Sequence, residues 1–100
     1  MIKEMDTMKK STKWDAADYL DSEEVISEYI NAALEDGDPA IISAALGDVA
    51  RARGMSQLSN ETGVTRDGLY KALSPTGNPS FATVQKVITA LGLKVVVQPA

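Results

Sequence analysis

The sequence contains neither cysteine nor histidine. Without cysteine it has no disulfide framework and no thiolate nucleophile, and without histidine it lacks the usual imidazole base and the commonest metal ligand. Catalysis would need paired carboxylates or a lysine, yet the acids are predicted on helix faces and no glycine-rich phosphate loop is present. We therefore expect no enzymatic activity, no catalytic residues, no bound metal and no cofactor.

Long apolar runs are also missing. No segment approaches the roughly 18 apolar residues of a membrane-spanning helix, and the opening stretch MIKEMDTMKK has no apolar centre of the kind found in signal peptides. Together with the lack of cysteine, this predicts a cytoplasmic protein with no membrane partner. A length of 100 residues, with 44% hydrophobic and 24% charged residues, is ordinary for one globular domain.

Charge is distributed unevenly along the chain, whose formal net charge is −4. Residues 1–50 contain 4 Lys or Arg and 12 Asp or Glu, whereas residues 51–100 contain 6 and 2, so the halves carry −8 and +4. This asymmetry predicts a nucleic acid as partner of the basic half and a cationic partner for the acidic half. The alternative is that the acidic helices serve only solubility.

Apolar residues recur at helical spacing over most of the chain, which predicts an all-α domain. Two helices are expected in DSEEVISEYINAALEDGD and DPAIISAALGDVARARG, two shorter ones in MSQLSNETG and VTRDGLYKALS, and a last one in SFATVQKVITALG, with Phe81 facing inward. The expected N-terminal caps are Ser22, Asp38, Ser56, Thr65 and Ser80. Gly47 inside the second helix predicts that a neighbouring helix crosses there closely.

The two ends of the chain are expected to differ from the helical domain in residues 15–93. Residues 1–14 contain few large apolar groups and are expected to form a flexible arm. In residues 94–100, the β-branched run between Gly92 and Pro99 predicts a short strand. A lone strand leaves its backbone groups unpaired, so we expect it to pair with its counterpart in a homodimer, through Val95, Val96 and Val97. Packing against the domain or against a partner's sheet are the alternatives.

The stretch SQLSNETGVTRDGLYKAL is typical of a helix-turn-helix unit, with Gly63 in the turn. In such a unit the second helix enters the major groove of DNA while the first crosses the phosphate backbone. Arg66 is suited to a guanine edge, and Asp67 to a cytosine amino group or to holding Arg66 in place. The candidate DNA-binding residues are Ser56, Gln57, Thr65, Arg66, Asp67, Tyr70, Lys71 and Asn78. The alternative is a solvated polar face. Gly68 predicts close approach to DNA or to another helix.

The run LGDVARARGMSQLSNETGVTRDGLYKALSPTGNPSFATVQKVITALGLKV resembles the addiction-module antidote proteins, a HigA-like branch of the phage-repressor (XRE) type helix-turn-helix antitoxins. The segments ARARGMSQL, GLYKALS, GNPSF and ALGL carry the resemblance, which extends from Trp14 to about Val95. It implies a five- to six-helix lambda-repressor-like domain followed by the short C-terminal strand. One departure is Ser59, where the pattern commonly has alanine; its hydroxyl is expected to bond back to the helix.

The function that the resemblance implies is that of a type II antitoxin. Such a protein neutralises a cognate basic toxin, here of the RelE/HigB class, and represses their shared operon by binding operator DNA as a homodimer. The alternative is a phage-type transcriptional regulator without a toxin partner. The candidate toxin-binding residues are Trp14, Asp18, Asp21, Glu24 and Glu28.

Overall fold

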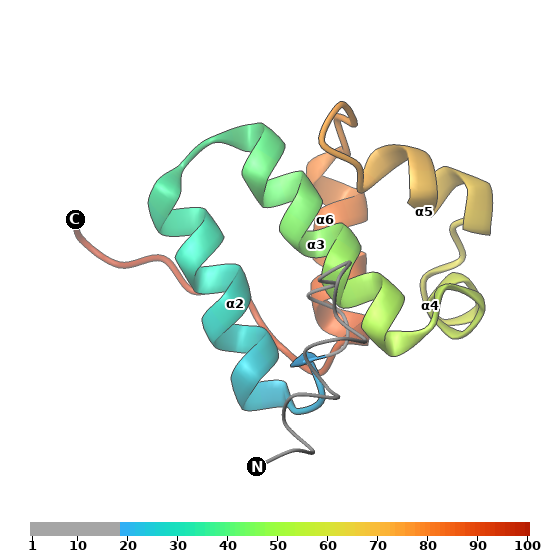
Figure 1. Cartoon of the computed structure of the whole chain (residues 1–100), viewed down its shortest axis with the longest axis horizontal. Helices are drawn as coiled ribbons and strands as arrows, with labels where there is room; N and C mark the ends of the chain where they lie inside the picture. The colour runs from blue at the N-terminus through green and yellow to red at the C-terminus, as the bar shows by residue number, and fades with distance from the viewer. Residues whose placement is uncertain (1–18) are drawn as a thin grey trace, which may run out of the picture.

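The computed structural model describes residues 19–100, and the regular secondary structure in this part of the chain is all helical (Figure 1). Its helices are α2 (Glu23–Asp36), α3 (Pro39–Arg53), α4 (Met55–Thr62), α5 (Arg66–Ala72) and α6 (Phe81–Ala90). The prediction of an all-α domain is confirmed for residues 19–100. No helix among these residues is long and apolar enough to cross a membrane.

Helices α2 and α3 form a hairpin whose ends were predictable from their caps. Ser22 Oγ accepts a hydrogen bond from the Val25 amide at 3.1 Å, and Gly37 ends α2 in the left-handed conformation, at φ 85°. Asp38 Oδ1 accepts from the Ala40 amide at 2.9 Å, and Pro39 occupies the first turn of α3, where its missing N–H costs nothing. Both helices therefore begin where a side chain accepts from a free backbone amide, and both end at a glycine whose own amide donates back into the last turn.

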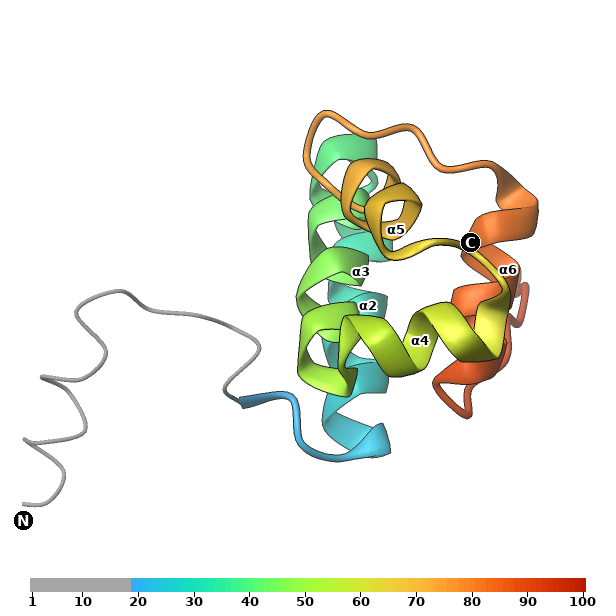
Figure 2. The ribbon, with the colours of Figure 1, turned by 90° about the vertical axis from the view of Figure 1, so that its right-hand side faces the viewer.

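The core lies where α3 meets the three later helices. Its fully buried side chains are Leu46, Leu58, Leu69, Leu91, Val49 and Val87. Figure 2 shows α2 and α3 on one side, α6 on the other, and α4 running between them beneath α5. The close crossing predicted at Gly47 is confirmed, because a Cβ atom there would collide with the backbone carbonyl oxygen of Leu73, at the end of α5.

Two local predictions are wrong. Helix α4 begins at Met55, and Gly54 rather than Ser56 holds the cap position, with no side-chain cap hydrogen bond. At φ 109°, Gly54 adopts a conformation that other residues rarely adopt, so backbone geometry places the cap two residues before the predicted one. Phe81 was expected to face inward, but it stands at the first residue of α6 and is 69% exposed, whereas Val84, Val87 and Ile88 further along the helix contact the core.

The predicted C-terminal strand is absent: residues 93–100 have no regular secondary structure. After Leu93, whose amide donates to the Ile88 carbonyl at 3.1 Å, no other extended segment within residues 19–100 lies beside the tail to form a ladder. Val95, Val96 and Val97 are 50%, 65% and 90% exposed. The role of these valines in a dimer stays a prediction. The flexible arm expected in residues 1–14 lies outside the described residues.

Candidate nucleic-acid interface

Helices α4 and α5 are joined by a short turn made of Gly63, Val64 and Thr65. Gly63 has a φ of 79°, and its amide donates to the Ser59 carbonyl at 2.9 Å. Leu58 on α4 and Leu69 on α5 are both fully buried, and Val64 packs against the same core. Gly63 therefore lies in the turn, as the sequence predicted, and both helices pack on the same core.

Two hydroxyl groups hold this turn from the α4 side. Ser59 Oγ donates to the Val64 carbonyl at 2.6 Å, so its hydrogen bond crosses the turn. The sequence predicted a bond back to its own helix, and that prediction is wrong. Thr62 Oγ1 donates to the Leu58 carbonyl at 2.8 Å and accepts from the Val64 amide at 3.2 Å. Sequence reasoning missed Thr62; its signal was a threonine in the last helical turn, where the hydroxyl commonly bonds four residues back.

The start of α5 is fixed by its cap. Thr65 Oγ1 accepts from the Gly68 amide at 3.0 Å, which confirms Thr65 as the N-cap. A Cβ atom on Gly68 would lie 3.0 Å from that same oxygen and 3.2 Å from Val64 Cγ1. Within residues 19–100 Gly68 is therefore closest to its own turn and not to another helix, and its approach to DNA stays a prediction. Glycine here lets the cap fold tightly over the first turn of α5.

The outward face of α5 carries the central candidate residues. Thr65, Arg66, Asp67, Tyr70 and Lys71 are all exposed. The Arg66 guanidinium lies 6.0 Å from the centre of the Tyr70 ring, a cation–π distance between residues one helical turn apart. Within residues 19–100 no ion pair joins Asp67 to Arg66, so Asp67 does not hold Arg66 in this structure. Arg66 and Tyr70 instead lie next to each other on the exposed side of α5.

The remaining candidates flank this face. Ser56 and Gln57 are exposed at the start of α4, and Gln57 Nε2 donates to Glu61 Oε2 at 3.2 Å. Asn78 is exposed in the loop between α5 and α6. That loop packs closely on α5, because a Cβ atom on Gly77 would collide with the backbone carbonyl oxygens of Lys71 and Ala72. The structure thus holds Asn78 near the C-terminal end of α5.

The acidic candidates are on a different part of the molecule. Helix α2 carries Glu23, Glu24, Glu28, Glu35 and Asp36 and contains no lysine or arginine. The toxin-binding candidates Asp21, Glu24 and Glu28 are exposed, whereas Trp14 and Asp18 lie outside the described residues. Helices α2 and α5 are on opposite sides of α3 (Figure 1). The acidic face of α2 and the polar face of α5 can therefore meet different partners.

Comparison with known proteins supports the antitoxin resemblance at the level of the family. The family model described as "Probable addiction module antidote protein" matches residues 10–99. A protein of Haemophilus influenzae, strain Rd, described as an uncharacterized protein, is 54% identical over 85 residues, which cover 85% of this chain and 88% of the relative. No solved structure matches the chain. Because the family model spans nearly all of the sequence, the chain belongs to the family of addiction module antidote proteins.

Proposed function

We propose that the protein is the antitoxin of a type II toxin–antitoxin module, which neutralises a basic toxin of the RelE/HigB class and represses its own operon by binding operator DNA. Membership of the antidote family supports the toxin partner. The observation that carries the DNA-binding half is the exposed face of α5, where Arg66 stands over Tyr70 after a rigid, side-chain-bonded turn.

In this proposal α5 enters the major groove and α4 crosses the backbone. Arg66 donates two guanidinium N–H groups to O6 and N7 of a guanine, and Asp67 accepts from a cytosine amino group. Lys71, Ser56 and Asn78 contact phosphates, which position the protein without selecting a sequence. Tyr70 contacts a thymine methyl or a phosphate while supporting Arg66. Gln57 joins the phosphate contacts after giving up its hydrogen bond to Glu61.

In this proposal the toxin binds the acidic face of α2. A toxin that binds RNA must be cationic, and it would meet an exposed acidic surface made by Glu24 and Glu28 on α2, a helix without a basic residue, and by Asp21 just before its cap. Both activities place the protein in the cytoplasm. A phage-type regulator with no toxin is the competing function, and the acidic face of α2 favours the antitoxin. Gene order separates the two, because an antitoxin gene lies directly beside a small basic open reading frame.

The DNA-binding proposal is tested by titrating the purified protein against DNA from upstream of its own gene, with a scrambled duplex as control. A lost bidentate arginine–guanine contact is worth about 1–3 kcal/mol, so Arg66→Ala should weaken selective binding roughly tenfold to a hundredfold. Arg51→Ala is the matched control, because Arg51 is an exposed cation on α3 paired with Asp48. Equal binding by Arg66→Ala and wild type would remove α5 from the interface.

The toxin-binding proposal is tested with the product of the neighbouring open reading frame. The triple variant Asp21→Asn, Glu24→Gln, Glu28→Gln keeps side-chain size and removes three charges. We expect it to bind the toxin more weakly and with less dependence on salt than wild type, because screening acts on the charges that were removed. Unchanged affinity and salt dependence would exclude this face of α2.

A further inference from the structure

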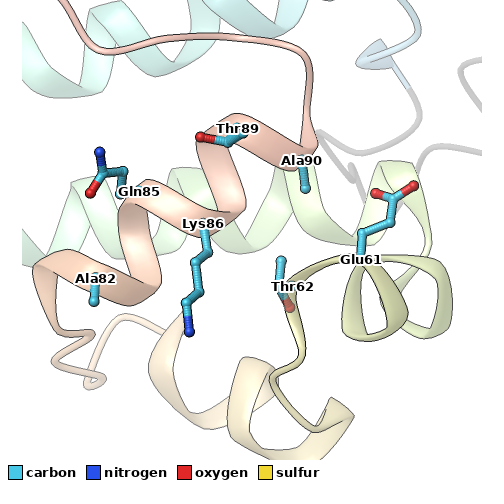
Figure 3. Close-up of a pocket in the computed structure, with 7 residues that line it drawn as sticks. All are labelled: Glu61, Thr62, Ala82, Gln85, Lys86, Thr89 and Ala90. Carbon is cyan, nitrogen blue, oxygen red and sulfur yellow. The ribbon is translucent and has the colours of Figure 1, made fainter.

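A groove of about 650 Å³ runs between the end of α4 and the outward face of α6 (Figure 3). Its lining residues are Glu61, Thr62, Ala82, Gln85, Lys86, Thr89 and Ala90. Small side chains form much of its surface, and the Thr62 hydroxyl is already committed to Leu58 and Val64. The groove therefore lets another surface approach the helix backbone closely, and the proposed contacts of α5 with DNA do not use it.

The groove carries opposite charges on its two walls. Glu61 stands on α4 and Lys86 on α6, and the two side chains extend in different directions (Figure 3). Within residues 19–100 Lys86 forms no ion pair, whereas Glu61 lies 3.5 Å from the Arg53 guanidinium. A uniformly basic partner would match Glu61 but not Lys86, and a uniformly acidic partner would match Lys86 but not Glu61. A surface with one charge of each sign fits a partner that also carries both.

We propose that this groove is the contact between two copies of the chain. A twofold axis requires the same patch on both copies to complement itself. With Lys86 of each copy against Glu61 of the other, the two charges are paired twice across one axis, and the alanine and threonine side chains let the two α6 helices approach.

This contact rests on the homodimer of the proposed function and gives that dimer an interface. It differs from the dimer contact predicted from the sequence, because Val95 and Val96 line a separate hollow with α2, on the other side of α6. The groove and the tail can therefore be tested by independent variants. Neither toxin nor DNA is needed for the measurement, so the outcome does not depend on those parts of the proposed function.

The experiment is sedimentation equilibrium of the purified full chain over a range of concentrations. We expect wild type to dimerise, and both Lys86→Glu and Glu61→Lys to be shifted toward monomer. Like charges facing each other across an interface cost several kcal/mol, so each variant should raise the dimer dissociation constant about a hundredfold. An equimolar mixture of the two variants should recover the dimer. In the mixed dimer the new glutamate at position 86 of one copy faces the new lysine at position 61 of the other, and the second contact pairs the native Glu61 with the native Lys86.

Two further variants keep the test decisive. Glu61→Lys also removes the ion pair with Arg53, so Ala82→Arg, which fills the groove from an exposed position, serves if that variant unfolds. Lys94→Glu is the control for charge reversal in the tail and should leave the dimer unchanged. A dimer that survives the groove variants, or that is lost only when residues 94–100 are deleted, would overturn the inference and leave the DNA and toxin proposals standing. A monomeric wild type would overturn both this inference and the homodimer.

Discussion

Gly47→Ala gives opposite predictions from the sequence and from the structure. Alanine is about 1 kcal/mol more favourable than glycine inside a helix, so local propensity alone predicts a more stable protein. In the structure, however, the added Cβ atom would overlap the carbonyl oxygen of Leu73 and lie 3.3 Å from its carbonyl carbon. Overpacking a rigid site costs up to about 3 kcal/mol, so we expect a net loss of about 2 kcal/mol in the free energy of unfolding.

The measurement is thermal unfolding followed by circular dichroism. For a domain of this size each kcal/mol moves the midpoint by about 4–8 °C, so the variant should melt about 8–16 °C below wild type. The control is Ala32→Gly at an exposed position of α2, which measures the propensity effect alone and should cost about 1 kcal/mol. A Gly47→Ala variant that is more stable than wild type would refute the close contact between α3 and the end of α5.

Three further changes test the turn and its supports. Thr65→Ala removes the cap of α5 and should lower the free energy of unfolding by about 1 kcal/mol, measured with urea; Thr65→Ser should restore it, and equal stability of all three proteins would contradict a capping role. Ser59→Ala leaves the Val64 carbonyl unpaired and should cost about 1 kcal/mol, with faster amide exchange in the turn; unchanged exchange would show that this bond is dispensable. Arg53→Met removes the 2.7 Å hydrogen bond to the Ala90 carbonyl and should lower the melting temperature, whereas Arg53→Lys should recover part of the loss; equal melting of both variants would argue for packing alone.

The proposed DNA and dimer surfaces share structural support. Arg53 joins the end of α3 to the carbonyl end of α6 and to Glu61 on α4. Thr62 belongs both to the groove and to the turn that leads into α5. A dimer contact at the groove would therefore lie next to the turn that orients Arg66. In the proposed operator complex, two such units would present their second helices to half-sites about 34 Å apart.

Much of the helical pattern could be predicted from short stretches of sequence, because the interactions that begin and end a helix are local. Ser22, Asp38, Thr65 and Ser80 each accept a backbone hydrogen bond two or three residues ahead, as their position before an apolar repeat predicted. Where the local signal was weaker, the prediction failed. Gly54 displaced Ser56 as the cap because this one glycine, with a positive φ, both ends α3 and begins α4.

The sequence by itself therefore determined the helices, the exposed polar side of α5 and the charge difference between the halves, since these follow from spacing and composition. Tertiary structure alone decided the contact of Gly47 with Leu73, the bond of Ser59 across the turn and the groove that brings Glu61 near α6. The predicted strand near Val96 is also absent from the structure, because a strand forms only when another extended segment pairs with it. The contact at Gly47, the groove and strand pairing depend on segments distant in sequence, and the Ser59 bond depends on how the turn after α4 folds, so the apolar spacing of the sequence does not encode them.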